Sequence, residues 1–310
     1  MNARAWVGRI VANETLNYTL TNRLPRRQLN RFMAWFSRIR NPVVRRLSIA
    51  TWRYFADVDL SDAMASSFTS LHDCFTRQLR PGARPFIADA ATLASPCDAI
   101  VGATGTIVGD DAVQAKGRRY PLSELLEDPA LASHYVGGTY ATLRITAGMY
   151  HRFHAPYDCR VTSVTHIAGD TFNVNPPALR RVDRLYCRNE RAVIRCRLVG
   201  GSPGGPDVDG QLVTLVPVAA ILVGGIRLHC ADLLLHGRYR GPRQVACDAR
   251  LRKGDEMGWF EHGSTIIVLV PAGWSLADGL AEGAPVRTGE ALMWCGRRGD
   301  SRAAGCTAPP

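Results

Sequence analysis

The chain has no pair of cysteines with Cys-x-x-Cys spacing, although it contains nine cysteines in 310 residues. They are scattered through the sequence, at positions 74, 97, 159, 187, 196, 230, 247, 295 and 306. A zinc ribbon needs closely spaced ligands and a disulfide framework needs an even set, so the sequence argues against both. We therefore expect a protein of a reducing compartment, with no metal site.

Long apolar segments are also missing. The uncharged stretch of residues 211–226 is too short for a membrane-spanning helix and contains Pro217 and a glycine pair. Residues 1–6 lack the apolar run and the small-residue cleavage site of a secretory signal. We expect neither a spanning helix nor a secretory signal.

The composition favours a folded, β-rich body. Hydrophobic residues make up 46% of the chain, which is enough for one large core, and the 29 glycines and 18 prolines indicate many short elements joined by turns. Runs of β-branched residues bounded by turn residues predict strands at 160–167, 191–199 and 265–270. Residues 121–128 resemble a short helix.

Two further segments bear on the fold class. Residues 95–105 and 283–292 have the strand and turn pattern of biotinyl or lipoyl carrier sandwiches, but neither offers the lysine to which a carrier attaches its cofactor. We keep the geometry and reject the carrier function. The predicted class is α+β, mainly β, with a sandwich-like, strand-rich catalytic body preceded by N-terminal amphipathic helices.

Positive charge is concentrated at the start of the chain. The net charge is +11, and residues 1–60 hold eleven arginines against three acidic residues. Within residues 26–40, apolar side chains recur at helical intervals while Arg27, Arg31 and Arg38 fall on the opposite face. This basic amphipathic helix could pack on the core, or it could lie in a membrane interface with Trp35 and Phe36 inserted.

A second helical region is expected at 43–70. We therefore predict a basic, helical, membrane-associating region at 1–70, a β-rich catalytic domain at 71–299, and a flexible tail at 300–310.

Four short segments carry residue types suited to catalysis: 95–98, 150–156, 185–191 and 253–267. Each segment also has a structural explanation when taken singly. Asp98 follows Ser-Pro, a pattern typical of turns. His151 and His154 could form a structural pair or bind a metal, and Ser264 could simply begin a strand.

In their order and contexts, these segments resemble the phosphatidylserine decarboxylase family, from about residue 75 to 271. The segment 150–156 matches the family's Tyr-His-Arg-x-His-x-Pro element, and 188–191 matches Arg-Asn-Glu-Arg. The remaining similar parts are 75–77 with 79–85, 95–98, and 253–260 followed by Gly263-Ser264-Thr265. Agreement in five ordered parts is highly specific.

The sequence departs from the family pattern in three places. His262 stands before Gly-Ser-Thr where the family usually has leucine, which places a titratable ring beside the scissile bond. Ala99 replaces a glycine after Asp98, and Asp158-Cys159 replaces a turn that contains glycine. None of these changes removes a group that performs the chemistry.

The resemblance implies self-cleavage between Gly263 and Ser264. The Ser264 hydroxyl would attack the Gly263 carbonyl, with His154 as its base and Asp98 as the partner of His154. Ser264 would then become a covalent pyruvoyl group, the cofactor. The products would be a large chain ending at Gly263 and a small chain of 47 residues, associated as a heterodimer that the family pairs further into dimers.

The resemblance also implies the reaction, which converts phosphatidylserine to phosphatidylethanolamine and CO2 in phospholipid biosynthesis. His151 would deliver a proton to the carbon that loses CO2. The expected partners are the phosphatidylserine substrate and an anionic membrane surface, without nucleic acid. The expected location is peripheral, on the cytoplasmic side of the cell (inner) membrane.

Two alternatives remain open at this point. A serine hydrolase could use Ser264, His154 and Asp98 as a triad without cleaving itself, although Gly-x-Ser-x-Gly is absent around the serine. A non-enzymatic protein that binds anionic membranes would explain the arginine-rich start but not the histidine and Gly-Ser-Thr segments. Chain cleavage distinguishes the enzyme from both.

Overall fold

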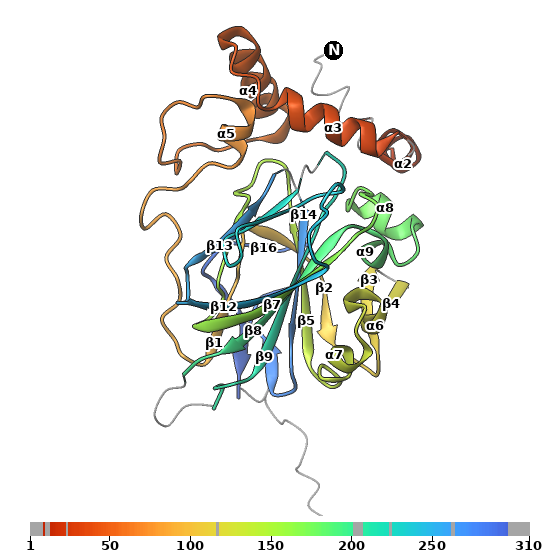
Figure 1. Cartoon of the computed structure of the whole chain (residues 1–310), viewed down its shortest axis with the longest axis vertical. Helices are drawn as coiled ribbons and strands as arrows, with labels where there is room; N and C mark the ends of the chain where they lie inside the picture. Colours follow the sequence, from red (N-terminus) through yellow and green to blue (C-terminus); the bar gives the residue numbers. More distant parts are fainter. Residues whose placement is uncertain are drawn as a thin grey trace, which may run out of the picture.

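An eight-stranded antiparallel sheet organises the computed structural model, which describes Arg9 and residues 13–22, 24–115, 118–200, 207–222, 225–261 and 264–296. The sheet curves through the middle of the molecule (Figure 1). In spatial order its strands are β12 (Gln244–Leu251), β7 (Cys159–Ile167), β8 (Arg191–Leu198), β9 (Leu212–Val218), β14 (Ser264–Val270), β5 (Thr139–Ile145), β2 (Ala99–Thr106) and β16 (Pro285–Val286).

Three smaller sheets complete the β-body. One has four strands in the order β11 (Leu233–Leu235), β10 (Ile226–Leu228), β13 (Glu256–Phe260) and β6 (Arg152–His154). A three-stranded sheet joins β1 (Thr92–Ala94), β17 (Ala291–Cys295) and β15 (Trp274–Leu276), and β3 (Asp111–Ala115) pairs with β4 (Arg118–Pro121). Every named strand pair is antiparallel, so the expected α+β, mainly β class is confirmed.

The sequence of each strand matches its depth in the sheet. Residues 265–270 of β14 are fully buried, as expected of a strand whose run of β-branched and aliphatic residues is covered on both faces. By contrast, β12 at the edge alternates exposed and half-buried residues. The strands expected at 160–167, 191–199 and 265–270 are confirmed as β7, β8 and β14.

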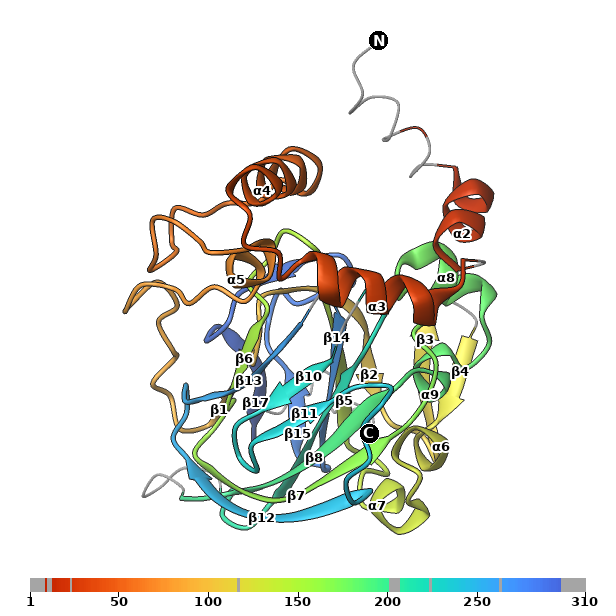
Figure 2. The same ribbon diagram turned by 45° about the horizontal axis from the view of Figure 1, so that its top comes forward.

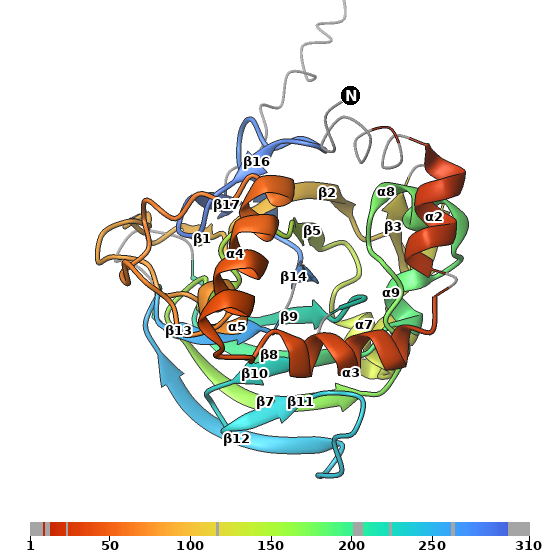
Figure 3. The same cartoon turned by 90° about the horizontal axis from the view of Figure 1, so that it is seen from above.

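Four helices from the first quarter of the chain cover one end of the strands (Figure 1). They are α2 (Glu14–Asn22), α3 (Arg26–Phe36), α4 (Pro42–Ala56) and α5 (Leu71–Phe75). Seen from above, α3 and α4 cross the end of the β-body rather than lying along its side (Figure 3). The N-terminal helices therefore form a roof over the strand ends.

The boundaries of these helices differ from the sequence-based expectation. α3 ends at Phe36, and Asn41 begins α4, because its side chain accepts hydrogen bonds from the backbone nitrogens of Val43 (3.0 Å) and Val44 (3.3 Å). The helix expected at 43–70 is wrong beyond Ala56. Asp57 has a left-handed φ of 48°, which ends α4.

Four short helices pack beside the sheet: α6 (Leu122–Leu126), α7 (Pro129–Ser133), α8 (Pro176–Arg181) and α9 (Leu185–Arg188). α6 confirms the helix expected at 121–128, although it is shorter. Among the described residues, no helix combines the length and apolar character needed to cross a bilayer. The tail expected at 300–310 lies outside the described residues.

Candidate active site

Three of the candidate catalytic segments meet around the short strand β6. β6 pairs with β13, so His154 lies opposite Glu256. On its other side, the His154 backbone nitrogen donates to the Pro96 carbonyl over 2.8 Å, which brings in the turn that carries Asp98. The segments 95–98, 150–156 and 253–260 are therefore neighbours in space.

The hydrogen bonds of the His154 ring define its tautomer, and its burial favours the neutral form. Its Nδ1 lies 2.9 Å from the Gly254 carbonyl oxygen, which can only accept, so Nδ1 carries the hydrogen. Nε2 is then the basic nitrogen, 3.1 Å from the Tyr150 hydroxyl. Burial lowers the pKa of His154, against weaker opposing effects of the Gly254 carbonyl and nearby carboxylates. A neutral imidazole with an accepting Nε2 can serve as a general base.

Gly254 explains part of this geometry. Its φ of +97° lies in the region that favours glycine, and an added Cβ would lie 3.1 Å from the Phe86 ring. The glycine of the Lys253-Gly254 motif thus allows the chain to turn and aim its carbonyl oxygen at His154.

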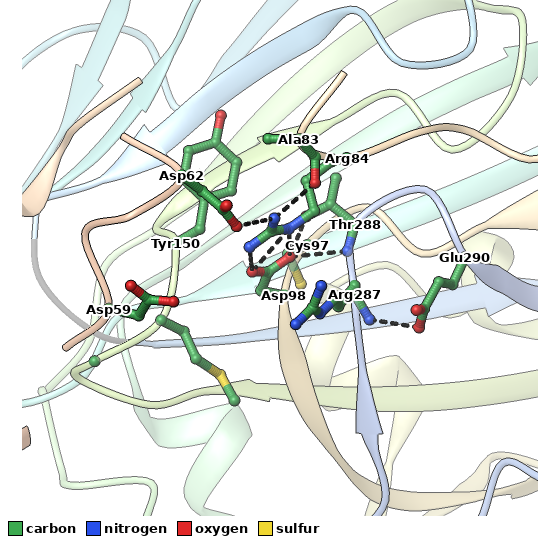
Figure 4. Close-up of polar contacts among 12 residues, drawn as sticks. Asp59, Asp62, Ala83, Arg84, Cys97, Asp98, Tyr150, Arg287, Thr288 and Glu290 are labelled. Atoms are coloured by element: carbon green, nitrogen blue, oxygen red, sulfur yellow. Dashed lines mark hydrogen bonds and ion pairs between the residues drawn. The ribbon is translucent and has the colours of Figure 1, made fainter. Parts of the chain in front are cut away.

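Asp98 is buried and held by hydrogen bonds from two residues (Figure 4). The Arg84 guanidinium donates to both carboxylate oxygens, with Nη2 2.7 Å from Oδ2 and Nε 2.9 Å from Oδ1. The backbone nitrogen and hydroxyl of Thr288 each donate to Oδ1 over 2.9 Å. Burial opposes the charge, but these hydrogen bonds outweigh it and lower the pKa of Asp98.

Asp98, expected to orient the His154 ring directly, does not form a hydrogen bond with it. The hydrogen bond that fixes the His154 ring comes from the Gly254 carbonyl, and the Asp98 carboxylate faces Arg84 and Thr288. Asp98 still acts on His154 through space, since its negative charge favours the protonated imidazole. The two residues share the site without a direct hydrogen bond between them.

Ser264 is the first residue of β14, and the structure describes its backbone. It pairs with Ile145 of β5, and Thr265 pairs with both Arg144 and Val218. Gly263 and His262 lie outside the described residues. The chain enters this region from Phe260, whose nitrogen donates to the His151 carbonyl over 3.0 Å. Four Cα–Cα steps span at most about 15 Å, so Ser264 is tethered within that reach of Phe260.

His151 is fully buried, and its ring centroid lies 3.8 Å from that of Phe75 in α5. Phe75 also lines a cavity of about 830 Å³ beneath the helical roof. Ile145, the backbone partner of Ser264, lines the same cavity. The start of β14 thus adjoins this cavity, and His151 packs against one of its lining residues. No sequence motif indicated the cavity.

Glu261, three residues before Ser264, was also missed by the sequence reasoning. Its buried carboxylate forms an ion pair with Arg38, lies 2.7 Å from His72 Nε2 and accepts from Trp259 Nε1 over 3.2 Å. Burial opposes the charge, but His72 and Arg38 outweigh it and lower the pKa of Glu261 to about 2. Because Arg38 follows α3 and His72 lies in α5, Glu261 ties the segment before Ser264 to the helical roof. Both helices lie above the ends of β13 and β14 (Figure 2).

Comparison with known proteins supplies an independent finding. Residues 71–293 match the sequence model of a family described as phosphatidylserine decarboxylase. A phosphatidylserine decarboxylase proenzyme of Halorhodospira halophila is 38% identical over 292 residues, which cover 90% of this chain and 93% of the relative. Proteins of the same name from Chromobacterium violaceum and Brevibacillus brevis are 37% and 33% identical, covering 77% and 88% of this chain and 84% and 95% of their own lengths.

Proposed function

The chain belongs to the phosphatidylserine decarboxylase family, and we propose that it matures by cutting itself before Ser264 and then converts phosphatidylserine to phosphatidylethanolamine and CO2. It is an enzyme, a decarboxylase made as a proenzyme. The proposed residue roles rest mainly on His154, which is neutral and has an Nε2 that can accept a proton. The same segment, through the His151 carbonyl, also holds Phe260, four residues before Ser264.

Self-cleavage begins with the Ser264 hydroxyl, whose proton passes to His154 Nε2 as the oxygen attacks the Gly263 carbonyl. The Gly263–Ser264 C–N bond breaks and an ester forms. Loss of the Ser264 α-proton then expels the Gly263 carboxylate from the serine β-carbon. This elimination leaves a Cα=Cβ double bond at residue 264 beside the free amine. A proton shift to the β-carbon converts this enamine into an imine, and one water hydrolyses the C=N bond and releases ammonia, which leaves a pyruvoyl group at position 264.

The position of Ser264 suits such a group. From Ser264 onward β14 is paired with neighbours, so residue 264 stays anchored when the bond before it is cut. The pyruvoyl group supplies an electrophilic ketone that accepts the electron pair left by departing CO2. His151, buried against the cavity-lining Phe75, would give its ring proton to the substrate carbon that loses CO2. Arg84 and Thr288 hold Asp98 ionised nearby, which favours a cationic imidazole at His154 during cleavage.

The two chains would remain together without the peptide bond. β14 of the small chain pairs with β5 and β9, and β16 and β17 pair with β2 and β1 of the large chain. These contacts bury the whole of β14 beyond Ser264. The strand pairing therefore suffices to hold the large and small chains together after cleavage.

Intact mass spectrometry of the purified wild-type protein tests the maturation. We expect two chains of 263 and 47 residues that co-elute under native conditions, with the small chain blocked to sequential degradation from its N-terminus. A single full-length wild-type chain with an unmodified Ser264 would instead favour the serine hydrolase.

The helical roof supports a peripheral membrane location, with residues 1–70 as the membrane-associating region and the decarboxylase domain from residue 71. Phe32 and Trp35 of α3 are 51% and 64% exposed, and their rings lie 5.9 Å apart. Leu47 of α4 is also 64% exposed. Exposed aromatic residues on a basic amphipathic helix favour insertion among anionic headgroups. We place the protein on the cytoplasmic face of the cell membrane.

Replacing both Phe32 and Trp35 with serine is expected to weaken binding to phosphatidylglycerol-containing vesicles by more than about tenfold, because two aromatic side chains no longer enter the interface. Vesicle flotation measures the change. Val108→Ser is the matched control, since Val108 is 69% exposed but lies outside the helical roof. Equal binding of the double variant and the wild type would show that α3 does not contact the membrane.

A further inference from the structure

The cavity beneath the helical roof has a lining that is almost entirely uncharged. Helices α3, α4 and α5 and the ends of β5 and β9 contribute mostly apolar side chains. Among the described residues that line it, Arg144 alone is charged. An apolar cavity with one polar anchor is typical of a site for an amphipathic ligand.

The Arg144 guanidinium has no counter-charge in the described part of the chain. It forms no hydrogen bond or ion pair with any described residue, and it interacts electrostatically with the buried, neutral hydroxyl of Tyr186. Burial lowers the pKa of Arg144, although a guanidinium remains charged in proteins. A half-buried, permanently charged group without a partner is costly, and a bound anion would remove that cost.

Arg144 also lies beside the reacting residue. On β5 it is paired with Thr265, the residue that follows Ser264, and with Ile100, two residues after Asp98. Directly opposed residues of antiparallel strands have Cα atoms only about 4.5–5.5 Å apart. Arg144 also lines the same cavity as Ile145, the residue paired with Ser264, so an anion held by Arg144 would lie in the cavity that adjoins position 264.

The cavity opens toward the outer surface along α4. Leu47 and Phe55 line the cavity and are nevertheless 64% and 43% exposed, so one wall of the cavity is also molecular surface. Met33 and Phe36 line it from α3, the helix that exposes Phe32 and Trp35. An apolar chain can pass from a membrane surface into this cavity without crossing a charged side chain that lines it.

We propose that Arg144 binds the phosphate oxyanion of the phospholipid substrate while an acyl chain occupies the cavity between the helical roof and the strand ends. This inference rests on the proposed function. The guanidinium fork suits a phosphodiester, to which it can donate two parallel hydrogen bonds. The serine carboxylate is the less suitable partner, because a cation on the group that leaves as CO2 would stabilise the ground state and slow the reaction.

The phosphate is present in both substrate and product, whereas the carboxylate is present only in the substrate. In the processed Arg144→Gln enzyme, we expect the KM for dihexanoyl phosphatidylserine to rise at least about tenfold, with kcat within about threefold of wild type. Inhibition by dihexanoyl phosphatidylethanolamine should weaken by a similar factor. Arg144→Lys should restore part of the substrate affinity and part of the product inhibition, since it keeps the positive charge but loses the two parallel hydrogen bonds of the guanidinium.

Each contrary result has a defined meaning. Unchanged KM and unchanged product inhibition would overturn the proposal. A higher KM with unchanged product inhibition would assign Arg144 to the carboxylate and overturn the phosphate assignment. Arg250→Gln on the edge strand β12 is the matched control, because Arg250 is exposed and lies across the sheet from β5.

A second measurement needs no cleavage and so separates this inference from the proposed maturation. Binding of dihexanoyl phosphatidylethanolamine is compared by calorimetry between full-length Ser264→Ala and Ser264→Ala/Arg144→Gln. We expect at least about tenfold weaker binding in the double variant. Equal affinities would overturn the anion site even if self-cleavage proceeds as proposed, and a loss would support the site even if it does not.

Discussion

Replacing Ser264 with alanine is expected to leave the protein as one uncut 310-residue chain without decarboxylase activity. Alanine lacks the hydroxyl that would attack the Gly263 carbonyl, and it lacks the β-oxygen whose loss would create the ketone. The fold should persist, because residue 264 joins the sheet through backbone pairing with Ile145. Intact mass spectrometry and a decarboxylation assay on the same preparation measure both effects.

The serine exchange has two informative controls. Ser133→Ala removes an exposed hydroxyl at the end of α7 that donates only to the Ala130 carbonyl, so maturation should be normal. Ser264→Cys keeps a nucleophile at the same position and should restore some cleavage. A Ser264→Ala protein that still yields a 47-residue chain with a carbonyl terminus would contradict the proposed origin of the cofactor.

Glutamine exchanges at the two buried histidines are expected to separate maturation from turnover. His154→Gln removes the base, so self-cleavage should slow by about 10²- to 10⁴-fold and uncut chain should accumulate. His151→Gln should mature fully, yet lose about 10²- to 10⁴-fold in kcat, since its proposed role begins only after the ketone exists. Time-resolved intact mass spectrometry gives the first rate, and assays of fully cut protein give the second.

The pH dependence of self-cleavage follows from the environment of His154. Burial lowers its pKa, so the neutral base persists at and above neutral pH, and the rate should fall only on acidification through that lowered pKa. His134→Gln is the matched control, because His134 is exposed at the end of α7.

Blocked maturation in His151→Gln, or normal maturation in His154→Gln, would contradict the assignment of the two histidines to turnover and to self-cleavage.

The sequence predicted the β-body well because its signals are local. The β-branched run of β14 and the turn-bounded strands β7 and β8 are where the pattern indicated. Helix boundaries were less predictable. Nothing in residues 43–56 shows that Asp57 adopts a left-handed conformation, which depends on how the following segment packs.

The site was predicted in its residues but not in its contacts. His154 and Asp98 were found from motif resemblance, but the oriented ring depends on the carbonyl of Gly254, a hundred residues further along the chain. A carbonyl contact leaves no side-chain signature, although the glycine itself was part of a motif. Arg144 lies outside every candidate segment, and Glu261 lies in the segment 253–267 but between its two matched parts. The importance of both rests on what surrounds them after folding.

The long-range construction of the site has a consequence for how the enzyme appears in a cell. His154 acquires its tautomer only when β6 is paired with β13, and residue 264 is anchored only when β14 has entered the sheet. On the proposed mechanism, a nascent or misassembled polypeptide therefore has no means of making its own ketone. Maturation then depends on correct folding, so each molecule that carries the reactive ketone has already folded correctly.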